Sequence, residues 1–75
     1  MITNIADFAA LIFDDFATRL STSGHTDIAQ CYIEDRLELW SKHPFAQSLD
    51  AQGLGKVRDL LFQGFSSNNI TIVSN

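Results

Sequence analysis

The sequence contains few of the residues that small proteins use to fasten a fold covalently or through a metal ion. Its one cysteine, Cys31, excludes a disulfide within the chain, and sparse cysteine is typical of a reducing compartment such as the cytoplasm. The two histidines, His25 and His43, flank a predicted helix and would lie roughly 25 Å apart, because a helix rises ~1.5 Å per residue. We therefore expect no structural metal site and no cofactor, and we interpret Cys31 as a small buried apolar residue.

Basic residues are also scarce. Five Lys and Arg face nine Asp and Glu, which gives a net charge of −4 and a pI near 4.7. The acidic excess lies in residues 1–38, where seven acids and two arginines give −5, whereas residues 39–75 carry two acids and three basic residues and give +1. An acidic chain lacks the attraction to phosphates that supplies non-specific nucleic-acid affinity, and anionic membrane surfaces repel it. We expect neither nucleic acid nor a membrane as its partner.

Long hydrophobic runs are missing as well. The longest covers residues 8–13, which is too short for a membrane span and lacks the basic flank of a signal peptide, so we expect neither. Catalytic motifs are not apparent. Adjacent Asp14 and Asp15, with Asp7 two turns earlier, fit a solvated acidic face better than a catalytic carboxylate pair. The sequence therefore predicts a protein that is not an enzyme.

What the sequence does contain is enough apolar residues for one small core. Hydrophobic residues make up 45% of the 75-residue chain, which favours a single helical domain over residues 1–75. A domain of this size buries only about 60% of the surface that its unfolded chain exposes, so its stability is marginal. Because disulfides and metals are missing, association is the stabilising device that remains, and we expect a homodimer.

Helical periodicity dominates the first half of the chain. Asn4 fits an N-cap, apolar residues recur at helical spacing from Ile5 onward, and Gly24 supplies a C-terminal signal, which together predict a first helix. A second helix is predicted to begin at Thr26 or Asp27 and to run to about residue 42. Apolar residues cover about half of its circumference, so we expect it to be the central helix, packed on two sides.

Proline and glycine divide the second half into shorter elements. Pro44 is well placed as the first residue of a short helix, and glycines at positions 53 and 55 predict a turn over residues 52–55. A further helix follows and ends at Gly64 and residues 66–69. Residues 70–73 fit a short strand that would pair with residues 2–5, pair with the same segment of a second copy, or stay frayed.

These elements predict an all-α fold: a small bundle of three to four short helices, with the option of a short C-terminal β-strand. The first helix is expected to pack across the second. The last helix is expected to close the core from the other side.

One arginine stands out on the second helix. Arg36 projects from its apolar half, one turn from both Tyr32 and Trp40, and these residue types are enriched at binding hot spots. Two interpretations stay open. Arg36 forms either a cation–π cluster at an interface or an internal ion pair with Asp15 or another acid of the first helix.

The first helix carries a second candidate surface. Leu11 lies among polar residues, away from the apolar stripe, and Ala6, Ala10 and Ala17 form a flank of small residues that would let another helix approach. Together with the Arg36 cluster, this pattern predicts a chain that binds another chain. The candidate protein-binding residues are Leu11, Asp14, Asp15, Tyr32, Arg36 and Trp40.

Residues 47–61 carry a different signal. A helix-turn-helix has Gln, Ala, an apolar residue, Gly and a branched apolar residue at five characteristic positions. In this chain, the matching residues are, in the same order, Gln47, Ala51, Leu54, Gly55 and Leu61. This fifth of the chain resembles the helix-turn-helix motif of phage repressors. The resemblance implies DNA binding, with Lys56 and Arg58 at the start of a recognition helix.

The function that we expect is that of a small acidic non-enzymatic protein-binding module that acts stoichiometrically. Compact acidic chains of this kind occur among phage and mobile-element inhibitors of host machinery, including defence complexes. An acidic surface could also mimic phosphate charge, and the residues that would do so are Asp7, Asp14, Asp15, Glu34 and Glu38. The alternative is a helix-turn-helix DNA-binding transcriptional regulator that uses residues 47–61.

Overall fold

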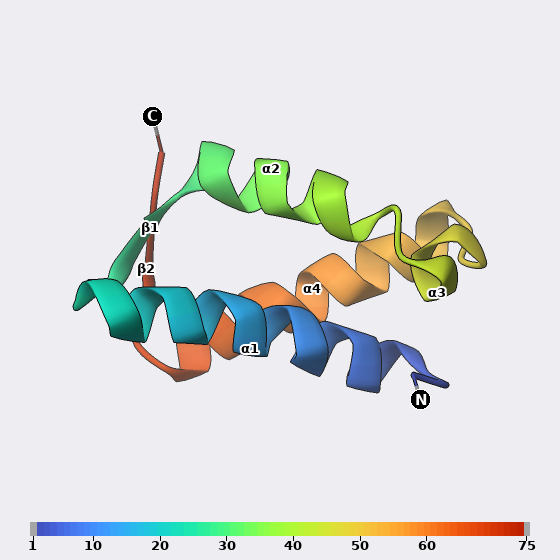
Figure 1. Ribbon diagram of the computed structural model, residues 1–75, viewed down its shortest axis with the longest axis horizontal. Helices are drawn as coiled ribbons and strands as arrows, with labels where there is room; N and C mark the ends of the chain where they lie inside the picture. Colours follow the sequence, from blue (N-terminus) through green and yellow to red (C-terminus); the bar gives the residue numbers. More distant parts are fainter. Residues whose placement is uncertain (1, 75) are drawn as a thin grey trace.

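The computed structural model describes residues 2–74 (Figure 1). Within them lie four helices and two short strands, in the order α1 (Ile5–Ser23), β1 (Asp27–Ala29), α2 (Gln30–Trp40), α3 (Pro44–Gln47), α4 (Ala51–Ser67) and β2 (Thr71–Val73). The prediction of a mostly helical fold with a short C-terminal strand is confirmed. In this part of the chain, no helix combines the length and the apolar character needed to span a bilayer.

α1 begins and ends where its sequence signals predict. The Asn4 side chain accepts a hydrogen bond from the N–H of Asp7 at 2.8 Å, which satisfies a free donor of the first turn. At the other end Gly24 takes a left-handed conformation with a φ of 75°, and its N–H donates to the carbonyl of Leu20 at 2.9 Å. Local chemistry at the two caps therefore sets the limits of this helix.

α1 and α4 form the main helix pair, and much of the core lies between them. Each turns one face inward with four buried residues: Phe8, Ala9, Ile12 and Phe16 from α1, and Gly53, Val57, Leu61 and Phe65 from α4. Phe16 and Phe65 meet edge to face, with 5.4 Å between ring centroids. The two long helices therefore hold the core together.

A glycine in α4 permits the close approach of α1. A Cβ on Gly64 would lie 2.9 Å from the ring of Phe13. α4 ends at Ser67 with Asn68 as its C-cap, within the predicted end at residues 66–69, but Gly64, also expected to end the helix, lies inside it. The glycine is a packing position and not a helix stop.

α2 lies at the edge of the core. Ile33 is its one fully buried residue, and Leu39 is 53% exposed. The prediction of a central helix packed on two sides is therefore wrong. The first helix does contact the second, through Phe16–Tyr32 and Asp15–Arg36, but its main partner is α4. α2 also begins later and ends earlier than predicted, at Gln30 and Trp40, whereas Pro44 opens α3 as expected.

α4 is continuous from Ala51, so the turn predicted over residues 52–55 is wrong. Asp50 caps the helix by accepting a hydrogen bond from the N–H of Gly53 at 2.8 Å. Gly53 is buried against the side chain of Leu49, whereas Gly55 faces open space. Two glycines that suggest a turn in the sequence are therefore helical, because the Asp50 cap starts the helix before them.

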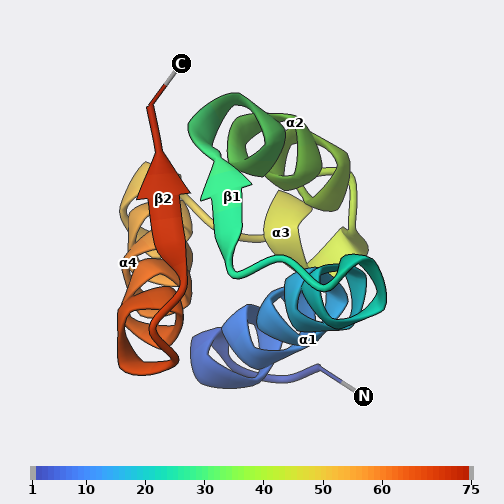
Figure 2. The same cartoon turned by 90° about the vertical axis from the view of Figure 1, so that its left-hand side faces the viewer.

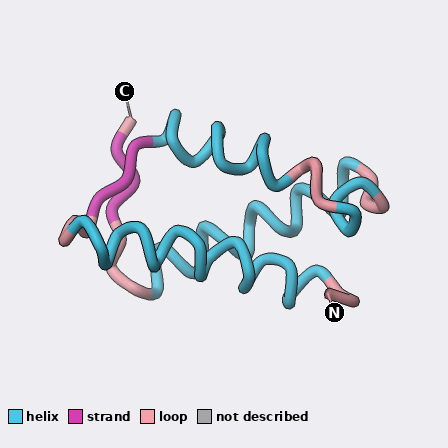
Figure 3. The backbone as a smooth tube through the Cα atoms, in the orientation of Figure 1, coloured by secondary structure: helices cyan, strands magenta, loops and turns pink. Residues whose placement is uncertain are grey.

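β1 and β2 pair in parallel at one end of the molecule, with α3 at the other end (Figures 2 and 3). The register joins residues 27–29 to residues 71–73 in order, and Ile28 at its centre is buried. The strand predicted near the C-terminus is confirmed, but neither predicted partner is correct. Asp27–Ala29, expected to be helical, forms the partner strand.

Candidate functional site

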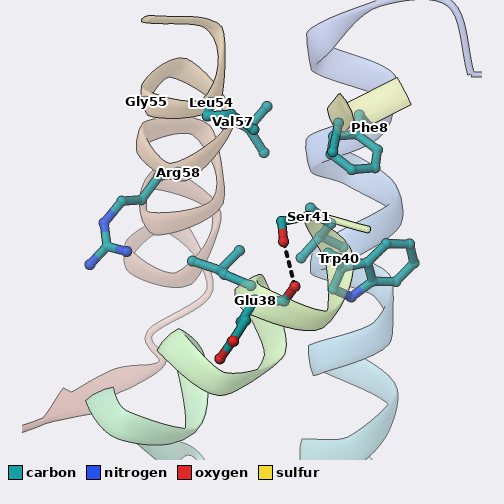
Figure 4. Close-up of a pocket in the computed structure, with 11 residues that line it drawn as sticks. Phe8, Glu38, Trp40, Ser41, Leu54, Gly55, Val57 and Arg58 are labelled. Carbon is teal, nitrogen blue, oxygen red and sulfur yellow. Dashed lines mark hydrogen bonds between the residues drawn. The ribbon is translucent and has the colours of Figure 1, made fainter. Parts of the chain in front are cut away.

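A cleft of about 330 Å³ lies between α2 and α4. Its walls are mostly apolar and come from three helices: Phe8 and Ile12 of α1, Leu37 and Trp40 of α2, and Leu54 and Val57 of α4. Phe8 and Ile12 are each 1% exposed, so α1 forms the base. Figure 4 shows Leu54 and Val57 pointing from α4 toward the side on which Phe8 and Trp40 lie. We call this site the α2–α4 cleft.

An aromatic cluster holds the wall of the cleft nearest α3. The ring of Phe8 lies edge-on to Trp40, with 6.1 Å between centroids, and 5.3 Å from the ring of Phe45. His43 lies 5.2 Å from Phe8, and its Nδ1 accepts a hydrogen bond from the N–H of Phe45 at 3.1 Å. Because these contacts tie α1, α2 and α3 together, the wall exists before any ligand arrives.

Two charged side chains line the edge of the cleft, Glu38 of α2 and Arg58 of α4. Glu34 and Glu38 lie one turn apart, and Glu34 pairs with Arg58 of α4. The hydrogen bond from Arg58 lowers the pKa of the Glu34 carboxyl below its ordinary value. Arg58 also lies over the ring of Phe62, 4.8 Å from its centroid. The Arg58–Glu34 pair therefore joins the two helices at one end of the cleft.

Glu38 is different from Glu34. Its side chain is exposed, and within residues 2–74 no ion pair joins it to a basic residue. Figure 4 shows its carboxylate directed away from Phe8 and Val57, while the Ser41 hydroxyl donates to the Glu38 backbone carbonyl at 2.5 Å. The cleft thus has an apolar interior and, at its edge, the Arg58 that pairs with Glu34 and a Glu38 that no ion pair joins to a basic residue of the described chain.

A polar cluster at Asp15 joins α1 to α2. Arg36 Nη2 lies 2.8 Å from Asp15 Oδ2, Arg19 Nε lies 3.2 Å from Oδ1, and Trp40 Nε1 donates to Oδ2 at 3.4 Å. Burial raises the pKa of the Asp15 carboxyl, but the hydrogen bonds from Arg36, Arg19 and Trp40 outweigh it and bring the pKa below its ordinary value. Of the two interpretations of Arg36, the internal ion pair is the one that forms.

The six predicted protein-binding residues are divided among several settings. Three of them meet in the Asp15 cluster, and one of these, Trp40, also lines the cleft. Tyr32 packs edge to face against a buried phenylalanine of α1 at 5.9 Å. Leu11, 37% exposed, and Asp14 face outward on α1, away from the residues that line the cleft. Their roles in binding remain predictions.

Sequence reasoning missed most of the cleft. Leu54 and Val57 fit one face of the last helix, and Leu37 fits the broad apolar arc of the second helix, so each looked like core. The width of that apolar arc was the available signal for an open apolar surface. The arc covers more of the helix than the single buried residue of α2 occupies. The cleft itself depends on how three helices are placed, which no local pattern encodes.

Lys56 and Arg58 lie in the second turn of α4, and not at the start of a recognition helix. The helix-turn-helix resemblance places Gly55 in a turn, but Gly55 is helical. Arg58 is already paired with Glu34, whereas Lys56 is exposed. The structure therefore lacks, within residues 47–61, the geometry on which the DNA-binding alternative depends.

Cys31 is exposed in the first turn of α2, so the prediction of a buried apolar residue is wrong. His25 lies 3.9 Å from Asp27, and both side chains are exposed. In residues 2–74, no group of three or more His, Cys, Asp or Glu is placed to hold a metal ion. Comparisons of the chain with protein-family models, with curated proteins and with solved structures find no match.

Proposed function

We propose that this chain is a protein-binding module that acts stoichiometrically and takes an apolar part of its partner into the α2–α4 cleft. The observation that carries the proposal is an open, mostly apolar cleft of about 330 Å³ in a chain of 75 residues. A domain this small has little apolar surface to spare from its own core. Concave apolar surface that stays open is typical of binding sites.

Leu54 marks the mouth of the cleft. It lines the cleft and is nevertheless 40% exposed, so an incoming side chain would cover it. Burial contributes roughly 25 cal/mol per Å² of apolar surface, and apolar groups at the centre of an interface dominate its energy. Trp40, on the opposite wall, belongs to the residue type that is most enriched at such centres.

A Leu54→Ser variant tests the proposal, with Leu60→Ser as its matched control. Leu60 lies on the same helix, is 38% exposed and does not line the cleft. The wild type and both variants are immobilised, and the proteins that each retains from native lysate are compared. We expect a protein that the wild type and Leu60→Ser retain in a fixed stoichiometry and that Leu54→Ser loses.

Circular dichroism of the three proteins accompanies the capture, because a binding loss counts only when helix content is unchanged. Retention of the same proteins in equal amounts by all three would contradict a binding role for the cleft.

We further propose that the module is non-enzymatic, acts in the cytoplasm and forms a homodimer. Its small size, its single cysteine and its exposed leucines outside the cleft support these assignments. Inhibition of a host defence complex by a phage or mobile element is the role that suits a stoichiometric acidic binder. Addition of the protein to such a complex should then inhibit it with saturation at a fixed number of copies per complex.

A further inference from the structure

We infer that the occupant of the α2–α4 cleft is an amphipathic helix of a partner protein, with Lys or Arg beside its apolar ridge. This inference rests on the proposed function and deepens it, because it states the chemistry of the partner. Three features of the structure support it: the partial burial of α2, the shape of the cleft and an acid at its rim that forms no ion pair within residues 2–74.

The first feature is the incomplete packing of α2. α1 and α4 each bury four residues, whereas α2 buries Ile33 alone. α2 continues directly from β1 at one end and is tied to α3 at the other by the Phe8–Trp40–His43–Phe45 cluster. Between these ends, Leu37 packs against the core with part of its side chain and lines the cleft with the rest. The apolar surface left open between α2 and α4 is one against which the ridge of another helix can pack.

The second feature is the form of the cleft. Two helices and a base of aromatic and aliphatic side chains make a groove, and a groove of this kind accepts one ridge of a helix with apolar residues at positions i, i+3 and i+4. Its volume of about 330 Å³ is at the small end of the range for ligand pockets, which suits a few side chains and not a whole folded surface.

The third feature is the charge at the rim. Glu34 and Glu38 are like charges one turn apart, an arrangement that is unfavourable unless it is compensated. Arg58 pairs with Glu34, but within residues 2–74 no ion pair joins Glu38 to a basic residue. The chain as a whole carries −4. A Lys or Arg placed one turn from the apolar anchor of the partner would meet Glu38 and supply the missing charge.

The single tryptophan provides a direct readout. Trp40 lines the cleft, so its fluorescence should change when the cleft is filled. The probes are two designed helical peptides without tryptophan, with the same leucine ridge. One carries Lys beside the ridge, and the other carries Glu at the same positions. We expect saturable binding of the Lys peptide, weaker binding of the Glu peptide, and loss of affinity for the Lys peptide as salt rises.

Two variants test the charge contact. Glu38→Gln should weaken the Lys peptide about two- to fivefold, which is the range for a solvent-exposed ion pair. Asp35→Asn is the matched control, because Asp35 is an exposed acid of the same helix that does not line the cleft. Its affinity for the Lys peptide should equal that of the wild type. Equal effects of the two substitutions, or no preference for the Lys peptide over the Glu peptide, would overturn the basic partner.

Two more outcomes separate this inference from the proposed function. If neither peptide binds but capture from lysate still depends on Leu54, the cleft binds protein and the helical basic occupant is wrong. If the Trp40 signal depends on protein concentration without any peptide, and still does so in Leu11→Asp, a second copy fills the cleft, and the inference is again wrong. If Leu54→Ser and Leu60→Ser weaken the Lys peptide equally, the peptide binds elsewhere, and both proposals lose their site.

Discussion

Asp15 is the residue at which α1 and α2 are held together by charge. It accepts hydrogen bonds from Arg19 on its own helix and from Arg36 and Trp40 on α2. The Asp15 and Arg36 side chains are 22% and 21% exposed, so the pair is partly desolvated and stronger than a fully solvated one. Because Trp40 is both a donor to Asp15 and a wall of the cleft, this cluster also positions the candidate site.

An Asp15→Asn variant should lower the free energy of unfolding by about 1–3 kcal/mol at neutral pH, because Arg36 then lacks its charged partner. The folded-state pKa of Asp15 lies below its unfolded value of about 3.9, so the contribution is present above that pH and is lost as the pH falls through the folded-state pKa. The difference between wild type and variant, measured by urea denaturation, should therefore shrink below about pH 4.

Asp14→Asn is the control for this prediction, since Asp14 is the adjacent exposed acid and no ion pair joins it to another residue in the range 2–74. It should change stability by less than about 0.5 kcal/mol at any of these pH values. A difference between wild type and Asp15→Asn that stays constant down to pH 2 would contradict the ionised pair.

Alanine substitutions at Gly55 and Gly64, both in α4, test how closely α1 and α4 pack. Alanine is normally the better helix former by about 1 kcal/mol, so Gly55→Ala, with open space around its Cβ, should raise the melting temperature. Gly64→Ala should lower it, because the new Cβ would lie 2.9 Å from the ring of Phe13 and force α1 and α4 apart, at about 1–3 kcal/mol. Thermal unfolding of both variants measures this. A gain in stability for both would show that α1 and α4 are not closely packed there.

Among the elements, α1 was predictable because its signals are local. Asn4 and Gly24 cap it, and the apolar period between them is continuous. β1 was not predictable in the same way. Its residues have a helix-compatible pattern, and what makes them a strand is pairing with β2, at the far end of the sequence. A lone short strand has no stability without such a partner. Contacts between distant segments are what the local pattern leaves out.

The pairing of β2 with β1 gives an element-scale prediction. Ile72 pairs with buried Ile28 and is half-buried, whereas Val73 in the same strand is 42% exposed. Ile72→Ala should cost about 1–2 kcal/mol of unfolding free energy, below the range for a fully buried isoleucine. Val73→Ala should cost less than about 0.5 kcal/mol. Urea denaturation of the two variants checks this, and equal small effects would mean that β2 does not cover the core.

The α2–α4 cleft, like β1, could not be predicted because it depends on contacts between distant segments of the chain. The alternative based on residues 47–61 relied on Gly55 as a turn residue, but the Asp50 cap begins α4 four residues earlier than that turn would end. The true site combines Phe8, Leu37 and Val57, which no spacing in the sequence relates to one another. Individual apolar stripes could be predicted, whereas the surface that they leave open depends on the final arrangement of the helices.

On the whole molecule, some large apolar side chains outside the cleft are also exposed to solvent. Leu11 on α1 and Leu60 on α4 are 37% and 38% exposed and lie outside the cleft. Single exposed leucines are ordinary on protein surfaces. In an acidic chain of 75 residues with a small core, however, exposed leucines such as these, and Leu39 of α2 at 53%, are available for association. Leu11 lies near a flank of small residues that would let another helix approach, so we place the proposed homodimer contact there and take Leu60 as its control.

We predict that light scattering of the wild type gives twice the 8.4 kDa mass of one chain. Leu11→Asp should reduce the mass to one chain without loss of helix content, whereas Leu60→Asp should remain a dimer. Asp14 lies one turn from Leu11, and each copy carries −4, so the two copies repel each other. Added salt screens this repulsion and should tighten the dimer, the opposite of its effect on the Lys peptide. A mass of one chain for the wild type at every salt and protein concentration would contradict the dimer, and equal dissociation of both variants would contradict the α1 surface.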